Sequence, residues 1–235
     1  MTSLLAARGL AIPSRLHATD LDIDGPALVC LVGPNGSGKT SLLHALARIG
    51  KPGGSVRIDG FDPDRLGLEE RRRLIAYLPA SRDIAWPLAA RHVIALGLPE
   101  GANRGGMEAA SSLLGLEPLL DRRIDRLSTG ERSRILIARA LAPAPRLALL
   151  DEPAANLDPA WQLRLMDGLK AMARGGQAVI AAMHDLDLAL RYADRLVLMD
   201  EGRIAAEGDP TLLKSGDEIP KLFGVRRGEA GWTLV

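Results

Sequence analysis

The amino-terminal part of the chain alternates between short apolar runs and polar turns. In residues 21–24, leucine and isoleucine alternate with aspartate before a Gly-Pro turn at 25–26, a pattern that predicts a half-exposed hairpin. Residues 27–32 form an apolar run without polar alternation, which favours a strand buried on both faces. A glycine-rich segment follows, and residues 41–49 have helical character. The predicted order is therefore strand, glycine-rich loop, helix.

The central part of the chain has a different pattern. Helical character is present in three segments, residues 90–98, 106–116 and 128–142. We expect no strand among them. The sequence therefore predicts a single domain in which a helical insertion, residues 82–145, interrupts an α/β core formed by residues 1–81 and 146–235.

Strands and helices alternate again after this insertion. A helix is expected to begin after Asp158 as N-cap, with Pro159 at its first position, and to end at Gly175. Apolar side chains recur along it at helical spacing: Trp161, Leu165, Leu169 and Met172. Short apolar runs predict strands at 75–78, 147–150, 178–183 and 195–199, with a helix at 186–192.

The composition is that of an ordinary folded protein. Hydrophobic residues make up 47% of the 235 positions and charged residues 25%, so disorder is not expected. The 30 basic and 29 acidic side chains nearly cancel, which argues against nucleic-acid binding through a broadly basic surface. The one cysteine, Cys30, lies in an apolar run. We expect a buried thiol there, and an internal disulfide or cysteine metal cluster is excluded.

Membrane insertion and secretion are not expected either. No apolar run approaches the roughly 18–20 residues that span a bilayer, and the first residues lack the basic segment of a signal peptide. The prediction is a cytoplasmic protein that reaches a membrane only through a partner.

Residues 33–40, GPNGSGKT, match the phosphate-loop pattern G-x-x-x-x-G-K-[ST]. Glycines let successive backbone N–H groups surround the α- and β-phosphates, and the following helix adds its positive N-terminal end. In such a loop Lys39 reaches the β- and γ-phosphates, and the Thr40 hydroxyl is a ligand of Mg²⁺. The candidate nucleotide-binding residues here are Gly33, Pro34, Asn35, Gly36, Ser37, Gly38, Lys39, Thr40 and Ser41.

A second candidate is the acidic pair that ends the apolar run LALLDEP, residues 147–153. From a strand end, Asp151 can hold Mg²⁺ through water, and Glu152 can polarise an attacking water. Alone, such a pair is more often a solvated turn. After a phosphate loop in an α/β chain, it indicates catalysis.

The segment LSTGER, residues 127–132, is open to two interpretations. Ser128 and Glu131 have capping-box spacing, so they predict the start of a helix. Ser128, the Gly130 N–H and the helix N-terminus also have the chemistry of a second phosphate site. Periodicity alone favours the capped helix.

Five motifs occur in order: GPNGSGKT, LSTGE, LALLDEP, ANLD at 155–158, and MHD with His184. In this order and spacing they resemble the nucleotide-binding subunit of an ABC transporter, over nearly the whole chain. The resemblance implies an α/β fold: a P-loop NTPase core with a mixed sheet and an inserted helical subdomain. It also implies ATP and Mg²⁺ as cofactors, and a head-to-tail homodimer with two ATP molecules between the phosphate loop of one subunit and LSTGE of the other.

The resemblance also implies roles for single residues. Glu152 resembles the catalytic glutamate, His184 the switch histidine at the γ-phosphate, and Asp158 the aspartate that links the two sites. With Lys39, the first two are the catalytic candidates, and Thr40 and Asp151 are the metal candidates. Without the family, His184 at a strand end would be interpreted as structural. The signature segment that would meet the partner's nucleotide comprises Ser128, Thr129, Gly130 and Glu131.

Finer features are similar to one subgroup of ATPases. Segments 93–101 and 185–210, and the short opening at 10–16, resemble the subunits that power uptake of iron–siderophore, haem or cobalamin. This similarity implies import of a metal chelate, polytopic permease subunits, an external substrate-binding protein, and a place on the cytoplasmic face of the cell membrane. The helical insertion and the loop at 80–88, with Ile84 and Trp86, are expected to meet the permease.

The chain departs from the family pattern at three places. Ala80 replaces a glutamine that the family has near Mg²⁺ and the water, and loss of one such group typically slows a reaction by ~10²-fold; Ser81 is a candidate substitute through water. Thr129 replaces a glycine, a change we expect to be tolerated because Gly130 remains. The aromatic that stacks on adenine is absent, which leaves Ile12 or Arg15 to cover the base and predicts weak base specificity.

Two other functions are alternatives to a transport ATPase. Ala80 motivates a regulatory subunit that binds ATP and dimerises but hardly hydrolyses it. The retained catalytic and signature motifs argue against that alternative. A soluble ABC protein of DNA repair or chromosome organisation is disfavoured, because such proteins carry long coiled coils or zinc-binding cysteines and this chain has one cysteine.

Overall fold

The computed structural model describes residues 3–82, 87–102, 105–228 and 231–234. Its central sheet has six strands in the order β5-β6-β7-β3-β8-β9. The first five are parallel, and β9 pairs with β8 in the antiparallel sense. The strands are β5 (Ile75–Leu78), β6 (Leu147–Asp151), β7 (Ala178–Ala182), β3 (Leu28–Val32), β8 (Arg195–Asp200) and β9 (Arg203–Gly208).

A smaller antiparallel sheet, in the order β2-β1-β4, packs on one face of the central sheet. It consists of β1 (Leu5–Ile12), β2 (Leu16–Ile23) and β4 (Gly53–Ile58). The half-exposed strand that the sequence predicts is β2, whose hairpin partner is β1. The predicted turn at 25–26 does not close a hairpin; it carries the chain from the small sheet into β3, because β3 pairs only with parallel neighbours, β7 and β8.

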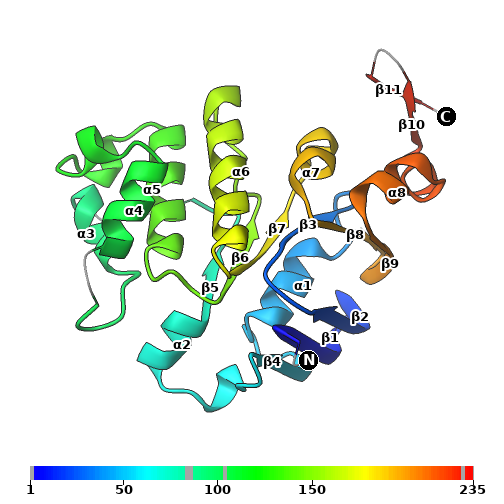
Figure 1. Ribbon diagram of the computed structural model, residues 1–235, viewed down its shortest axis with the longest axis horizontal. Coiled ribbons are helices and arrows are strands. Elements are labelled where there is room, and N and C mark those ends of the chain that lie inside the picture. The colour runs from blue at the N-terminus through cyan, green and yellow to red at the C-terminus, as the bar shows by residue number, and fades with distance from the viewer. Residues whose placement is uncertain (1–2, 83–86, 103–104, 229–230, 235) are drawn as a thin grey trace.

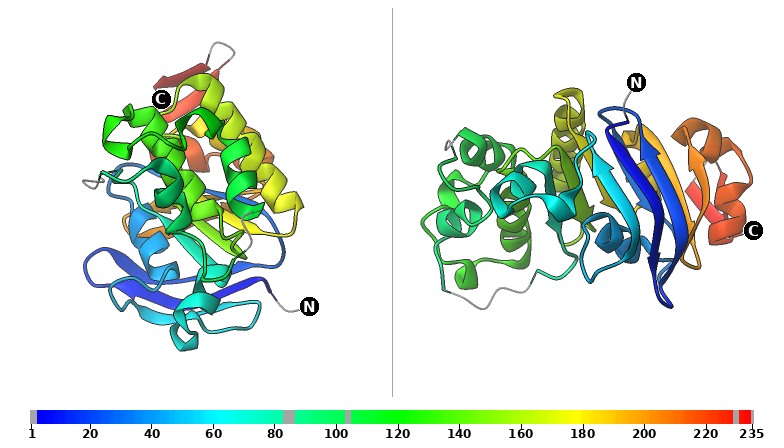
Figure 2. Two further views of the ribbon diagram at one scale, coloured as in Figure 1. Left: turned by 90° about the vertical axis from the view of Figure 1, so that its left-hand side faces the viewer. Right: turned by 90° about the horizontal axis from the view of Figure 1, so that it is seen from below.

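Among the described residues, helices lie at all six predicted places, and three more, at 68–74, 210–215 and 218–223, were not predicted. The helices are α1 (Lys39–Leu46), α2 (Leu68–Leu74), α3 (Ala90–Ala95), α4 (Gly105–Leu113), α5 (Thr129–Leu141), α6 (Pro159–Arg174), α7 (Leu186–Tyr192), α8 (Pro210–Ser215) and α9 (Glu218–Phe223). Between β5 and β6 the described residues form α3, α4, α5 and two short 3-10 turns. These three helices gather at one end of the molecule, opposite α8 and the terminal hairpin of β10 (Val225–Gly228) and β11 (Gly231–Leu234) (Figures 1 and 2).

The central strand β3 separates two hydrophobic cores. Leu28, Cys30 and Val32 face the core shared with α5, α6 and α7. Val29 and Leu31 face the core shared with α1 and the small sheet. All five side chains are buried, so the uninterrupted apolar run is explained by helices or strands on both faces of a parallel sheet. The Cys30 thiol is buried as expected, and burial raises its pKa to about 12.

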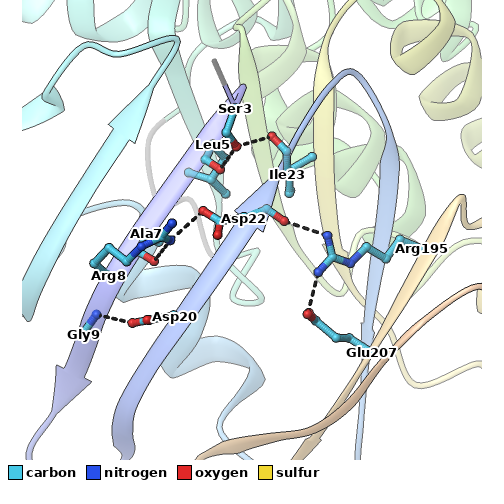
Figure 3. A network of polar contacts seen from close by, with 10 residues as sticks. All are labelled: Ser3, Leu5, Ala7, Arg8, Gly9, Asp20, Asp22, Ile23, Arg195 and Glu207. Carbon is cyan, nitrogen blue, oxygen red and sulfur yellow. Dashed lines mark hydrogen bonds and ion pairs between the residues drawn. The ribbon is translucent and has the colours of Figure 1, made fainter. Parts of the chain in front are cut away.

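Polar contacts hold the two sheets together along one edge (Figure 3). Arg195 of β8 donates to the carbonyl oxygen of Asp22 in β2, at 2.7 Å, and pairs with Glu207 of β9, also at 2.7 Å. The Asp22 carboxylate in turn pairs with Arg8 of β1 at 2.6 Å. These contacts fix the β1–β2 hairpin relative to β8, which positions the segment between the two hairpin strands over the site described below.

None of the helices in the described residues is both long and apolar enough to cross a bilayer. The predicted contact residues Ile84 and Trp86 lie outside the residues that the structure describes.

Candidate nucleotide-binding site

The phosphate loop connects β3 to α1 through backbone conformations that glycine alone adopts easily. Gly36 and Gly38 have φ of +82° and +100°, the left-handed region that side chains disfavour. Gly33 has another constraint, because a Cβ placed there would lie 2.2 Å from the carbonyl oxygen of Met199. The glycines therefore form the turn and allow β8 to approach the loop closely.

An open cleft of about 760 Å³ lies along this loop. One wall is the segment between β1 and β2, and the other walls are the loop, the β8–β9 turn and the ends of β6 and β7. Predicted site residues that line the cleft are Asn35, Gly36, Ser37, Gly38, Lys39, Thr40, Ser41, Glu152 and His184. Residues Ile12 and Arg15, predicted to cover the base, line it as well. Residues distant in sequence thus meet in one cavity.

Lys39, the first residue of α1, holds a positive charge at the base of the loop. Its ammonium group donates to the carbonyl oxygens of Gly33 at 2.7 Å and Pro34 at 3.0 Å. Burial lowers its pKa, and the nearby carboxylates of Glu152 and Asp151 oppose that shift. Gly33 and Pro34 therefore act through their backbone, orienting the lysine.

Asp151, at the end of β6, is buried beside the start of α1. Its carboxylate interacts with the hydroxyl groups of Thr40 and Tyr77. Burial raises the pKa of Asp151, the Thr40 hydroxyl lowers it, and the charge of Glu152 raises it further. One oxygen, Oδ2, is buried without a hydrogen-bond partner among the described residues. A hydroxyl oxygen beside an unpartnered buried carboxylate oxygen suits Mg²⁺, which prefers oxygen ligands.

Glu152 and His184 lie side by side at one edge of the cleft. The Nε2 atom of His184 lies 2.6 Å from Oε1 of Glu152, and both side chains are partly exposed. Glu152 has φ +50°, an unusual conformation for a residue with a side chain and one that often marks functional sites. A carboxylate held against an imidazole at the open side of a phosphate cleft can accept a proton from water.

The signature segment does not line this cleft within the described chain. Ser128 and Glu131 form the predicted capping box at the start of α5: the Ser128 N–H donates to Glu131 Oε2 at 2.8 Å, and the Glu131 N–H donates to Ser128 Oγ at 3.3 Å. Thr129 is exposed, and Gly130 packs against the backbone of Asn156. The segment therefore lies beside the 155–158 loop.

Asp158 also lies outside the cleft. Its carboxylate accepts a hydrogen bond from the Trp161 N–H at 3.0 Å and caps α6, as predicted. The contacts of the described residues show no link from Asp158 to the cleft.

Two residues near the site could not be found from the sequence motifs: Tyr77 in β5 and Arg82 in the loop that follows β5. The Tyr77 hydroxyl interacts with the Asp151 carboxylate, and Arg82 donates to the carbonyl oxygens of Asp151 and Glu152. Ala80, at the place of the family's glutamine, and its neighbour Ser81 are both exposed. The only sequence signal for Arg82 is a charged side chain close to an expected active-site loop.

Comparisons with known proteins agree with this geometry. A family model described as "ABC transporter" matches residues 16–155. The chain is 35% identical to the hemin import ATP-binding protein of Jannaschia sp. over 89% of its length and 82% of that protein. It is 36% identical to the cobalamin import ATP-binding protein of Halobacterium salinarum over 93% of its length, but spans only 56% of that relative.

The fold matches solved structures as well. One, a dimeric bacterial ABC transporter cassette, is 25% identical with a TM-score of 0.78, covering 88% of this chain and 98% of the cassette. The model match covers more than half of the chain, and two relatives exceed 30% identity over most of it. The chain therefore belongs to the ABC transporter family, as one of its ATPase cassettes.

Proposed function

We propose that this ATPase works as a head-to-tail homodimer that powers import of a metal chelate through a membrane permease. The observation that carries the proposed ATP hydrolysis is the Glu152–His184 pair, 2.6 Å apart at the edge of the phosphate cleft. In phosphoryl transfer, catalysis is mostly positioning and electrostatic stabilisation. The pair supplies a base for the water and a contact for the terminal phosphate.

The proposed roles follow from position in the cleft. The loop at 33–38 holds the phosphates through its N–H groups, and Lys39 turns its ammonium group to the β- and γ-phosphates. Thr40 and Asp151 would hold Mg²⁺, whose charge offsets that of the phosphates. Glu152 accepts a proton from the attacking water, while His184 keeps the carboxylate in place and contacts the γ-phosphate.

The dimer completes the site. Ser128, Gly130 and the N-terminus of α5 are free of the chain's own cleft, and their N–H and hydroxyl groups suit a phosphate. In the proposed dimer they contact ATP on the partner's phosphate loop, with Asp158 at the junction. The solved relative that is dimeric supports this assembly. The insertion at 82–145 then forms a helical subdomain that carries the signature segment.

The cargo is proposed from the relatives. One is named for hemin import and another for cobalamin import, so a metal chelate is the shared chemistry. Partner subunits in this proposal are a polytopic permease and an external substrate-binding protein, with the ATPase on the cytoplasmic face of the membrane. The permease and binding protein choose the compound, and the direction of transport follows from them.

A second candidate is a nucleotide-dependent regulatory subunit. The observation that favours it is Ala80, an exposed side chain without a polar group at the place where the family has its glutamine. In that function ATP would drive dimerisation while hydrolysis stays slow.

The test is ATP hydrolysis and ATP-dependent dimerisation of the purified protein, compared with Glu152→Gln, Ala80→Gln and Glu117→Gln. Glu117 is an exposed acid in a short turn that does not line the cleft, and it serves as the control. We expect Glu152→Gln to lower turnover by about 10²-fold or more and to accumulate an ATP-bound dimer. A wild type that dimerises without turnover, and regains it with Ala80→Gln, would favour the regulatory function.

A further inference from the structure

The side chain of Arg82 is the most unusual buried charge near the cleft. It lies on the loop after β5, 7% exposed. Its Nη2 donates to the carbonyl oxygen of Asp151 at 3.0 Å and to that of Glu152 at 3.1 Å. Its Nε and Nη1 atoms are buried and have no hydrogen-bond partner in the described part of the chain.

Burying the Arg82 guanidinium with unpartnered nitrogens destabilises the fold. An arginine stays protonated in proteins, so its charge cannot be removed by losing a proton. A buried charge without a full set of hydrogen bonds typically destabilises a protein by several kcal/mol. What offsets the burial of Arg82 is the negative charge of Asp151 and Glu152. A guanidinium that serves only the fold would more simply be replaced by an apolar side chain, which points to a role at the acidic pair.

The two accepting carbonyls identify that role. They belong to the proposed metal residue and to the proposed catalytic glutamate, and Glu152 has the left-handed φ of +50°. A residue in that region is strained, and surrounding contacts must hold it there. On one side, the Glu152 N–H donates to the Ala182 carbonyl at 3.1 Å. On the other, Arg82 holds the carbonyl of the same residue.

We infer that Arg82 is a positioning residue for hydrolysis: it holds Glu152 in its strained conformation, so that the loop after β5 controls the aim of the catalytic carboxylate. This inference rests on the proposed role of Glu152. In this inference Arg82, two residues after Ala80, links the loop to the reacting water. Arg82 itself does not line the cleft, so it acts through the backbone of Glu152 and not on the nucleotide.

The experiment measures kcat and KM for ATP, nucleotide affinity with a fluorescent ATP analogue, and thermal unfolding for Arg82→Ala and Arg82→Lys. We expect kcat to fall by about 10- to 100-fold in Arg82→Ala, since small misplacement of a reacting group has effects of that size. KM and the nucleotide Kd should stay within about 2-fold, because the phosphate loop is untouched. Arg82→Lys keeps a charge and N–H donors near both carbonyls and should recover a large part of the rate.

Arg71 offers a matched control. It also donates to two backbone carbonyls, those of Ala47 and Pro63, but on α2, away from the cleft. Arg71→Ala should lower thermal stability without changing kcat at temperatures well below unfolding. If Arg82→Ala behaves like Arg71→Ala, or if kcat and nucleotide affinity fall together, the positioning role is wrong. Should Arg82→Ala fail to fold, Arg82→Lys against Arg71→Lys makes the same comparison.

A double-mutant cycle separates this inference from the proposed function. If Arg82 acts through Glu152, adding Arg82→Ala to Glu152→Gln should change the single-turnover rate by less than about 2-fold. Multiplying effects would overturn the inference while leaving Glu152 catalytic. If Glu152→Gln hydrolyses ATP at the wild-type rate, the proposed role of Glu152 fails and the inference about Arg82 fails with it.

Discussion

The phosphate cleft and the N-terminus of α5 both present N–H groups suited to phosphate, but they are built in different ways. The cleft joins residues distant in sequence, such as Lys39, Glu152 and His184. Burial disfavours the charge of Lys39 there, and the nearby carboxylates of Glu152 and Asp151 favour it. The N-terminus of α5 is held by the capping box between Ser128 and Glu131, within four consecutive residues, and Ser128 and Thr129 are exposed. Contacts between distant segments therefore form the phosphate cleft, whereas local sequence forms the start of α5. Only the second lies outside the cleft of its own chain.

The largest effect should come from separating the two regions onto different chains. We expect Lys39→Ala and Ser128→Ala each to lower hydrolysis by about 10²-fold or more, since each removes a phosphate contact from both sites of the dimer. Mixed in equal amounts, the two variants should regain roughly a quarter of wild-type turnover. Random pairing makes half of the dimers mixed, and each of those has one intact site of two.

The geometry supplies the control for this mixing experiment. Lys39 and Glu152 line the same cleft of one chain, so a mixture of Lys39→Ala with Glu152→Gln has a defect in every site and should stay inactive. Recovery there, or none between Lys39→Ala and Ser128→Ala, would contradict the head-to-tail assembly. Because Ser128 also caps α5, its loss costs about 1 kcal/mol of stability, and turnover should be measured well below the unfolding temperature.

A pair of glycine substitutions compares the packing of the two regions. In Gly33→Ala the new Cβ would lie 2.2 Å from the Met199 carbonyl oxygen, whereas in Gly130→Ala it would lie 3.0 Å from that of Asn156. We expect Gly33→Ala to destabilise the fold by about 1–3 kcal/mol or more, as overpacking does. For Gly130→Ala the loss should be near zero, because alanine favours the helix by about 1 kcal/mol.

Chemical denaturation of both glycine variants checks this prediction, with hydrolysis measured in parallel. Gly130→Ala should keep its stability and lose turnover, because a methyl group at the start of α5 keeps the partner's phosphates away. Equal losses of stability at the two positions would show that the signature segment is packed as tightly as the phosphate loop.

Much of this architecture could be predicted from the sequence where local rules decide. The parallel strands appear as uninterrupted apolar runs, and the caps at Ser128 and Asp158 follow from spacing alone. The partner of β2 could not be predicted, because the Gly-Pro turn at 25–26 signals a change of direction and not the sheet that the chain enters next. Arg82 could not be predicted for a similar reason: its partners are backbone carbonyls some 70 residues away, and no side-chain pattern encodes them.

The smallest effect is expected on the base side of the cleft. There the wall is the 11–17 segment, with Ile12 and Arg15 in the place where the family carries an aromatic. A guanidinium stacks on any base through its planar face, and such exposed contacts contribute about 0.5–1 kcal/mol. Arg15→Ala should therefore weaken ATP and GTP binding by the same factor, roughly 2- to 5-fold.

Titration of fluorescent ATP and GTP analogues into the wild type and Arg15→Ala measures this effect. The control is Arg65→Ala, which removes the same charge from a guanidinium that is 82% exposed and outside the cleft. Wild-type affinities for the two nucleotides should lie close together, since stacking does not discriminate between bases. If ATP binds far more tightly than GTP, groups that read the edge of adenine are present, and the base side would then be organised by specific tertiary contacts like the phosphate side.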